Sequence, residues 1–297
     1  MSINDFKPLR IEDKALFDQF LREDPPRISE LTVTNLFMWR HKYRPVWKLE
    51  EGCLLVLFQT KEEGVYGLPP VGKGDKTRAL ERLCEEIGKV SPEVRICRVD
   101  EGFVRAHVDE GRYACLPDRD NSDYVYLTQD LIELSGNRYH RKKNHLNQFM
   151  KRYAFEYKVM DSTLVDSVLE MQESWCAMRE CALNPELSDE DWAVREALGG
   201  FGSLDYTGGV ILIDSRIEAF SIGEALNRET AVIHVEKANS RIHGLYAAVN
   251  HVFCKEAWSE FTYVNREQDM GEEGLRQAKE SYCPHHMVNK FTVIPKR

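Results

Sequence analysis

The sequence has no long apolar run. The longest candidate, Cys53–Phe58, has the length of a strand, whereas a helix that spans a bilayer needs about 20 apolar residues. The first residues contain acids where a secretory signal needs a basic start, and no continuous apolar segment follows them. These absences argue against a transmembrane segment and a signal peptide. We therefore expect a cytoplasmic protein.

Paired cysteines are also missing. The eight cysteines are scattered without a C-x-x-C pair, which predicts reduced thiols and gives no structural zinc spacing. His251 and Cys254 stand one helical turn apart, and two histidines follow Cys283. These residues could bind a metal, but no second ligand pair accompanies them. We interpret them as core or surface residues and expect no metal site.

Acidic side chains outnumber basic ones, 49 to 40. The formal net charge is −9, which argues against indiscriminate binding of nucleic acid or membrane. One segment departs from this balance, because no carboxylate lies between Glu133 and Glu156. Such a basic helix face could meet phosphates, or it could be a solvated face balanced by acids elsewhere. The cations of this segment are Arg138, Arg141, Lys142, Lys143, Lys151 and Arg152.

The length of 297 residues predicts about two domains, on a prior of roughly 150 residues each. A polar stretch at Pro117–Asp123 is a plausible boundary. Helical and strand patterns follow a similar order on both sides of it. We therefore predict two mixed α/β domains with separate sheets, at residues 1–118 and 119–297, the second with the active site.

Polar side chains gather where two predicted strands end, at residues 230–236 and 261–265. A helix at residues 244–258 connects these strands, and a second helix is expected at 272–282. Ligands of open α/β sheets bind beyond the carboxyl ends of strands. We expect one cleft there, lined by Glu236, Lys237, Asn265, Arg266, Glu267 and Asp269.

The order of elements in the second half resembles the GNAT acyltransferase fold, and the first half resembles a shorter copy. Such a tandem pair is similar to the Fem-type aminoacyl-tRNA-dependent transferases. Three segments carry a closer resemblance: LSGNRYHRKKNHLNQFMKRY, VEKAN and VNREQDMGEEGLRQAKESYCP. Together they resemble a bacterial family of unknown function that shares its domain with the C-terminal part of phosphatidylglycerol lysyltransferases. The resemblance spans nearly the whole chain.

The resemblance implies transfer of an aminoacyl group from tRNA to a lipid or cell-wall precursor. tRNA would contact residues 138–152, through Arg138, Arg141, Lys142 and Lys143, and a lipid acceptor implies peripheral membrane contact. Coenzyme A users of the wider fold carry R/Q-x-x-G-x-G/A before a helix. Arg241 and Gly244 fit that pattern as cofactor-binding residues, but Tyr246 is bulky where a small residue is expected. We therefore expect aminoacyl-tRNA as donor, acetyl-coenzyme A less readily, and no tightly bound cofactor.

Aminoacyl transfer requires a proton acceptor and positive charge near the developing oxyanion. No Ser-His-Asp or Cys-His spacing compels covalent catalysis, so direct attack is expected. Two alternatives remain open: the loop after residue 265 is only an ion-pair network, or the fold has kept a ligand or RNA surface without catalysis. The candidate proton acceptors are Glu236, Glu267 and Asp269, the candidate oxyanion or phosphate partners are Arg266, Lys279 and Lys290, and the candidate proton donor is Tyr282.

Overall fold

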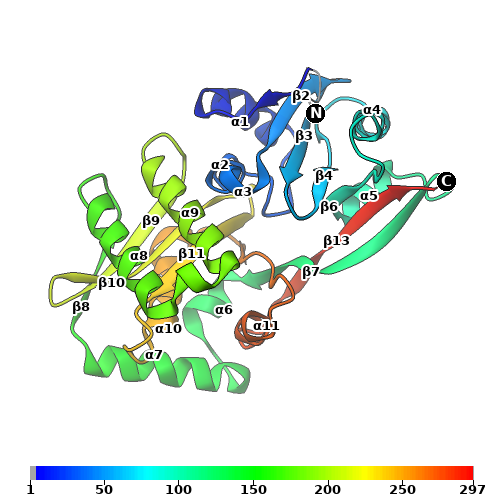
Figure 1. Ribbon diagram of the computed structural model, residues 1–297. Coiled ribbons are helices and arrows are strands. Elements are labelled where there is room, and N and C mark those ends of the chain that lie inside the picture. The colour runs from blue at the N-terminus through cyan, green and yellow to red at the C-terminus, as the bar shows by residue number, and fades with distance from the viewer. Residues whose placement is uncertain (1–4, 297) are drawn as a thin grey trace. The chain divides into compact units, whose positions relative to one another are not determined.

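The computed structural model describes residues 5–296, and the chain divides into two compact units (Figure 1). The first unit comprises the residues up to Asp123 together with those from Val288 onward. The second unit is Tyr124–Met287. This division differs from a boundary near residue 118 chiefly in the last ten residues, which lie in the first unit.

The first unit is a sheet with helices packed against it. A core of apolar side chains joins β2, β3, β6, α4 and α5. Helix α4 begins where the Asp75 side chain accepts a hydrogen bond from the Arg78 amide. Its elements are β1 (Lys7–Pro8), α1 (Lys14–Glu23), α2 (Val33–Met38), α3 (Arg40–Tyr43), β2 (Val46–Glu50), β3 (Cys53–Thr60), β4 (Gly64–Gly67), β5 (Val71–Gly72), α4 (Lys76–Gly88), β6 (Ile96–Asp100), α5 (Glu101–His107), most of β7 (Tyr113–Leu127) and most of β13 (His286–Pro295).

The second unit contains the elements from the end of β7 to α11. They are the end of β7, α6 (Thr128–Glu133), α7 (His140–Arg152), β8 (Phe155–Val159), α8 (Val165–Arg179), α9 (Pro185–Gly199), β9 (Thr207–Ile213), β10 (Arg216–Ala225), β11 (Thr230–Ala238), α10 (Leu245–Trp258), β12 (Tyr263–Asn265) and α11 (Glu273–Glu280). Three short 3-10 turns, at Ile11–Asp13, Asn137–Tyr139 and Cys181–Leu183, complete the described elements.

The strand order in the second unit is β7-β12-β11-β10-β9-β8. All neighbouring pairs are antiparallel except β11 and β12, which are parallel because α10 connects them. Helix α10 packs against β9, β10 and β11, with α6 and α7 beyond it, and α8 packs on β10 and β11 (Figure 1). A buried apolar cluster lies between α10 and the sheet.

The prediction of two separate sheets is wrong. Strand β7 is 15 residues long and includes the polar stretch that was expected to be a boundary. Its last residues, Val125–Leu127, pair with β12, and β7 also neighbours β13. Because β13 pairs in turn with β6, the hydrogen-bonded strands form one continuous path. The polar residues of β7 are tolerated because buried cations neutralise two of them, as described below.

Candidate functional site

The parallel pairing of β11 and β12 brings their carboxyl ends to one edge of the second unit. Glu236 lies near the end of β11, and Arg266 follows β12 directly. Arg266 Nη2 donates to Glu236 Oε1 at 3.0 Å, and Asn250 Nδ2 of α10 donates to Glu236 Oε2 at 3.1 Å. Both oxygens of the Glu236 carboxylate are therefore engaged. The expected meeting of Glu236 with Arg266 is confirmed.

Arg266 is enclosed by aromatic rings. Its guanidinium carbon lies 4.7 Å from the ring centroid of Tyr282 and 5.7 Å from that of Tyr126. Arg266 Nη1 is buried without a hydrogen-bond partner among the described residues, as is the side-chain oxygen of Asn250. Burial raises the pKa of the Tyr282 hydroxyl. An orphaned guanidinium N–H is costly unless a ligand oxygen accepts from it.

Lys142 reaches the same cluster from α7. Its Nζ lies 4.1 Å from the ring centroid of Tyr282, so two cations share one aromatic ring. Burial, and then the charge of Arg266, lower the pKa of Lys142 to about 8. Sequence reasoning assigned Lys142 to tRNA phosphates, but this side chain is half-buried against Tyr282. It is a group of this cluster that titrates near neutral pH.

Glu267 turns to a different partner. Its Oε1 lies 2.7 Å from His234 Nδ1, and His234 Nε2 lies 2.9 Å from Glu224 Oε1. Burial alone would lower the pKa of His234, but its hydrogen bonds to the two carboxylates raise it to about 10. The imidazole is therefore a cation at neutral pH. Glu267 belongs to a buried Glu–His–Glu chain beside the Glu236–Arg266 pair.

Asp269 is fully engaged in holding the loop. Arg276 donates to both of its oxygens at 2.9 and 3.0 Å, and the Tyr124 hydroxyl donates at 2.6 Å. Burial raises the pKa of Asp269, but the bonds from Arg276 and Tyr124 outweigh it and hold the pKa well below its usual range. Asn265 accepts from the Glu267 amide at 2.8 Å. Lys279 donates to the carbonyl oxygens of Arg266 and Glu267. The contacts of Asp269 match the ion-pair alternative, and Asn265 and Lys279 hold the backbone of the same loop.

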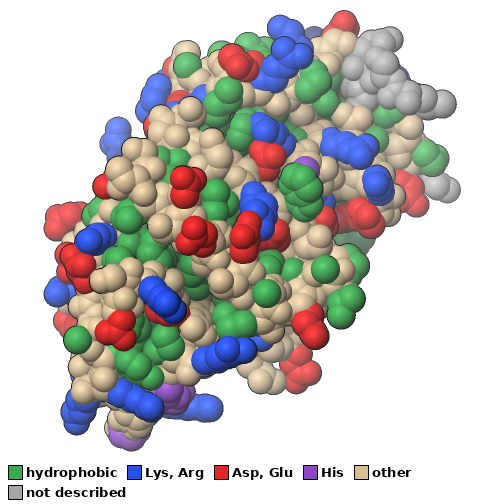
Figure 2. Space-filling model, turned by 60° about the vertical axis from the view of Figure 1, so that its left-hand side comes forward, with side chains coloured by type: hydrophobic (Ala, Val, Ile, Leu, Met, Phe, Trp, Pro, Cys, Tyr) green, Lys and Arg blue, Asp and Glu red, His purple; other side chains and the backbone are tan. Residues whose placement is uncertain are grey.

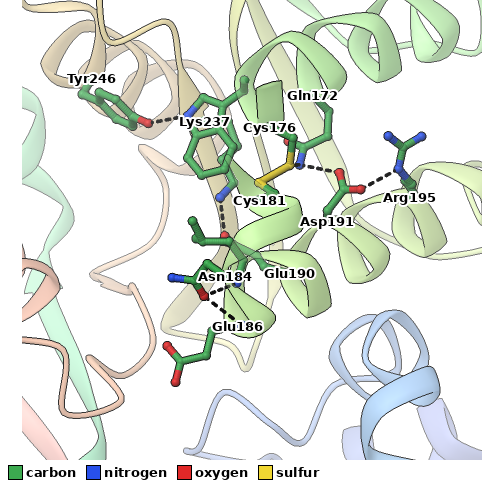
Figure 3. Close-up of a disulfide and its surroundings, with 12 residues drawn as sticks. Gln172, Cys176, Cys181, Asn184, Glu186, Glu190, Asp191, Arg195, Lys237 and Tyr246 are labelled. Carbon is green, nitrogen blue, oxygen red and sulfur yellow. Dashed lines mark hydrogen bonds and ion pairs between the residues drawn. A yellow bond between two sulfur atoms is a disulfide. The ribbon is translucent and has the colours of Figure 1, made fainter. Parts of the chain in front are cut away.

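Lys237 points away from Glu236, as neighbouring residues of a strand do. Its Nζ lies 2.5 Å from Glu190 Oε2 and 3.7 Å from the ring centroid of Trp175 (Figure 3). Burial lowers the pKa of this amine. Lys237 therefore belongs to the contact between β11 and the helices α8 and α9.

The same region corrects the cysteine prediction. Cys176 and Cys181 form a disulfide, shown beside Lys237 in Figure 3. Glu180 adopts a left-handed conformation with φ of 54° after α8, which brings the two Cα atoms to 5.1 Å. The five-residue separation of Cys176 and Cys181 does not by itself predict a disulfide. The reversal of the chain after α8, and not a C-x-x-C pattern, brings the two cysteines together. The remaining cysteines are free thiols: Cys53, Cys84, Cys97, Cys115, Cys254 and Cys283.

Lys290 lies in the first unit and is completely buried. Its Nζ contacts Glu30 Oε2 and Asp123 Oδ1, each at 2.6 Å. Arg98 adds an ion pair to Glu30 at 3.4 Å and another to Asp118 at 2.8 Å. Lys290 therefore neutralises carboxylates of the first unit, including one from the polar part of β7, and is not part of the Glu236 cluster.

The remaining cations of α7 and the turn before it face solvent. Arg138 pairs with Asp130 at 2.9 Å, and Lys143 donates to the Glu133 carbonyl at 3.3 Å. Arg141, Lys151 and Arg152 are exposed. Figure 2 shows Lys, Arg and His side chains gathered at the lower end of the face that it presents, the level at which α7 lies in Figure 1.

The turn with Arg241 and Gly244 is closed by packing. Gly244 has φ of +83°, and a Cβ there would stand 2.3 Å from the His145 carbonyl oxygen. Arg241 is exposed. The Tyr246 hydroxyl accepts from Trp175 Nε1 at 2.9 Å. Only a residue without a side chain allows the backbone of this turn to lie so close to α7.

Sequence reasoning missed His234 and Asn250. His234 lies where the β10–β11 register shifts, opposite Ile222 and Gly223, and a bulge cannot be read from strand alternation. Asn250 had a usable signal, because it is a polar residue within the buried face of α10, among Ala247, Val249 and Phe253.

Within residues 5–296 no helix is long and apolar enough to cross a membrane. No group of three or more His, Cys, Asp or Glu side chains in that part of the chain is arranged to hold a metal ion.

Comparison with known proteins gives a family and a fold. The family described as "Phosphatidylglycerol lysyltransferase, C-terminal" matches residues 23–294. An uncharacterised protein of Mycoplasmoides gallisepticum is 23% identical over 176 residues, which are 58% of this chain. The match spans little more than half of that relative, 56% of its length.

Solved structures cover more of the chain. A conserved protein of unknown function from Bacteroides thetaiotaomicron is 31% identical, with a TM-score of 0.92 over 98% of this chain and 99% of that one. The C-terminal domain of a putative lysylphosphatidylglycerol synthetase from Agrobacterium fabrum is 11% identical, with a TM-score of 0.69 over 96% and 92%. FemX is 9% identical, with a TM-score of 0.61 over 97% and 96%. The tandem GNAT-like acyltransferase fold, α/β with a mixed sheet, is confirmed.

Proposed function

The chain belongs to the family of phosphatidylglycerol lysyltransferase C-terminal domains, and from this premise we propose that it transfers an aminoacyl group from aminoacyl-tRNA to a lipid or cell-wall precursor. Its relation to transferases of this fold supports an acyl-transfer reaction in the broad sense. The donor, the acceptor and the residue roles below are parts of the proposal.

The observation that carries the proposal is the orphaned N–H of Arg266. Nη1 is buried without a partner beside Glu236 and Tyr282. Glu236 fixes the guanidinium through Nη2 and leaves the other end free to donate. A preoriented donor in a low-dielectric site is what an oxyanion intermediate requires. Arg266 would meet the carbonyl oxygen of the aminoacyl ester.

Lys142 is the proposed proton acceptor. At a pKa of about 8, roughly a tenth of this amine is neutral at pH 7, against roughly three in ten thousand at the ordinary value. The carboxylates around it are already bound: Glu236 by Arg266 and Asn250, and Glu267 by His234. Lys142 therefore replaces the carboxylates as the base in this scheme.

The reaction proceeds by direct attack. The acceptor hydroxyl or amine gives its proton to Lys142 Nζ and bonds to the ester carbonyl carbon. Negative charge then develops on the carbonyl oxygen beside Arg266 Nη1. The carbon–oxygen bond to the tRNA ribose breaks, and the ribose oxygen takes a proton from the Lys142 ammonium. The exposed cations of α7, continuous with Lys142, would contact tRNA phosphates. A lipid acceptor would be met at the membrane surface.

The test supplies the purified chain with a mixture of charged tRNAs and with lipid and cell-wall precursor extracts, and mass spectrometry searches for acceptors gaining one aminoacyl group. Glu236→Gln should lose turnover, because the guanidinium is no longer fixed. Glu229→Gln is the matched control, since Glu229 is exposed just before β11. Product that forms at the wild-type rate in Glu236→Gln would contradict the assigned site.

Two alternatives give different results in the same assay. Acetylated products from acetyl-coenzyme A, with none from charged tRNA, would indicate an N-acetyltransferase. Binding of tRNA with no product in any pool would indicate a non-catalytic ligand or RNA-binding module. The family and the unpartnered Arg266 N–H favour transfer over both.

A further inference from the structure

The first unit contains a pocket of its own. It has a volume of about 190 Å³ and lies between the turn after α1, the Pro69-Pro70 segment, the start of α4 and the helix α5. Drug-sized ligands occupy pockets of roughly 300–1,000 Å³. Its size therefore suits a metabolite with few heavy atoms.

The walls combine opposite charges with a rigid apolar lining. The charged residues are Asp24, Arg27, Lys76 and Asp100, two of each sign. Four prolines, at positions 25, 26, 69 and 70, line the pocket beside Ile28 and Leu31. Because proline fixes φ, these walls are preorganised and lose little conformational entropy when a ligand binds.

The positive end of the pocket is available. Arg27 is exposed and makes no hydrogen bond or ion pair with the residues that the structure describes. Its Nη1 lies 3.2 Å from the position that a Cβ on Gly102 would occupy, so the absence of a side chain at Gly102 leaves room for the guanidinium. A free guanidinium favours a carboxylate, which it can bind through two parallel hydrogen bonds.

The negative end is only partly satisfied. Asp100 Oδ1 accepts from the amides of Gly102 and Phe103 at 2.8 and 3.2 Å, which leaves its second oxygen unused by these bonds. Asp24 Oδ2 accepts a hydrogen bond from the Gly72 amide at 2.9 Å and forms an ion pair with Lys76 Nζ at 2.5 Å. The second oxygen of either carboxylate could accept from an ammonium. Phe103 and His107, with ring centroids 5.0 Å apart, offer an apolar surface beside them.

We propose that this pocket binds a free amino acid with an apolar side chain. Arg27 takes the carboxylate, Asp100 and Asp24 take the ammonium, and the proline and Phe103 walls take the side chain. The balanced charge of the lining selects a zwitterion over a simple anion or cation. The inference stands apart from the function proposed for the second unit, because every lining residue belongs to the first.

The test uses L-leucine as the probe, with the full chain and amide NMR. The Gly102 and Phe103 amide signals should shift in a saturable manner. 4-Methylpentanoate lacks the ammonium and isoamylamine lacks the carboxylate. Each should bind at least about tenfold more weakly, since each loses its charge-assisted hydrogen bonds. If either analogue bound as tightly as leucine, the proposed selection of a zwitterion would be wrong. If leucine caused no saturable shift, the proposed binding to this pocket would be wrong.

Matched variants locate the binding. Arg27→Ala removes an exposed side chain without an internal partner, so the fold should persist while leucine affinity falls at least about tenfold. Arg22→Ala, on α1 and also exposed, should bind as the wild type does. Glu236→Gln in the second unit should also leave binding unchanged. Loss in Glu236→Gln with retention in Arg27→Ala would assign leucine to the transferase site and refute this pocket.

Discussion

Single side chains near the strand ends differ more in role than in chemical type. Three carboxylates follow or end the neighbouring strands β11 and β12, and each has a different partner. Arg266 binds Glu236, His234 binds Glu267, and Arg276 binds Asp269. Each of the three already has a positively charged hydrogen-bond partner. The residue suited to proton transfer is therefore an amine, Lys142, whose charged form is penalised by burial and by Arg266.

Replacing Lys142 tests whether it acts as a proton acceptor or only supplies positive charge. Lys142→Met should lower the transfer rate by about 10²–10⁴-fold, the usual contribution of a positioned acid–base group. Lys255→Met removes the same charge from a lysine of α10 whose side chain is 59% exposed, and should change the rate little. In the wild type the rate should rise with pH through about 8, because the neutral amine is the active form. Equal losses in both variants, or a rate independent of pH from 6 to 9, would contradict the assignment.

Lys290 should matter for stability. Lys290→Met leaves Glu30 and Asp123 buried without their shared cation, and breaking such a buried network costs about 3–5 kcal/mol. Lys73→Met removes a lysine whose side chain is 71% exposed and should cost little. Urea unfolding at pH 7 measures both. A midpoint for Lys290→Met equal to that of Lys73→Met would show that the network contributes nothing net.

At the scale of elements, the sequence predicts what local chemistry controls. Helix α10 spans Leu245–Trp258, within the expected residues 244–258, because apolar side chains recur along its buried face. The parallel ends of β11 and β12 follow from their helical connection. The long strand β7 could not be predicted, because its polar residues are stabilised by Lys290 and Arg98, which are distant in sequence. The disulfide and the position of His234 likewise depend on local backbone geometry that residue types do not encode.

The buried chain of Glu224, His234 and Glu267 predicts a pH dependence of stability. The folded pKa of His234 is about 10, above the ordinary 6.5. The native state therefore holds this proton more tightly than the unfolded state. Its contribution is complete below about pH 6.5 and disappears as pH rises to about 10. Unfolding free energies at pH 6, 8 and 10 should fall more steeply in the wild type than in His234→Gln. Parallel pH curves for the two proteins would contradict this.

The turn before α10 bears on the choice of donor. Gly244 is packed against the His145 carbonyl, and the Tyr246 hydroxyl accepts a hydrogen bond from Trp175. A pyrophosphate therefore has little room to reach the backbone amides of this turn. We predict that acetyl-coenzyme A binds weakly. Calorimetry should detect no low-micromolar affinity in the wild type, and Tyr246→Ala should gain little, since Gly244 stays packed. Tight binding would favour the acetyltransferase alternative.

At the scale of the whole molecule, the net charge is −9. A surface that binds RNA must therefore be a local group of cations. The exposed cations of α7 are the candidate surface, and the structure narrows the set, because Lys142 turns inward and Arg138 is paired with Asp130. The residues expected to contact tRNA phosphates become Arg141, Lys143, Lys151 and Arg152, all exposed on one helix.

Salt dependence tests this surface. Each phosphate neutralised by the protein releases condensed counterions, so the logarithm of the tRNA binding constant should fall linearly with the logarithm of the salt concentration. Arg141→Glu combined with Lys151→Glu should weaken binding and reduce the magnitude of the slope by about two units. Arg216→Glu with Arg228→Glu, exposed positions on and after β10, makes the same change in net charge elsewhere and should retain the wild-type slope. If both double variants reduce the slope equally, overall charge sets the affinity; if neither does, α7 is a solvated face. Only a change confined to the α7 variant supports a tRNA contact, because counterion release reports phosphates that are neutralised and not the distant field of the protein.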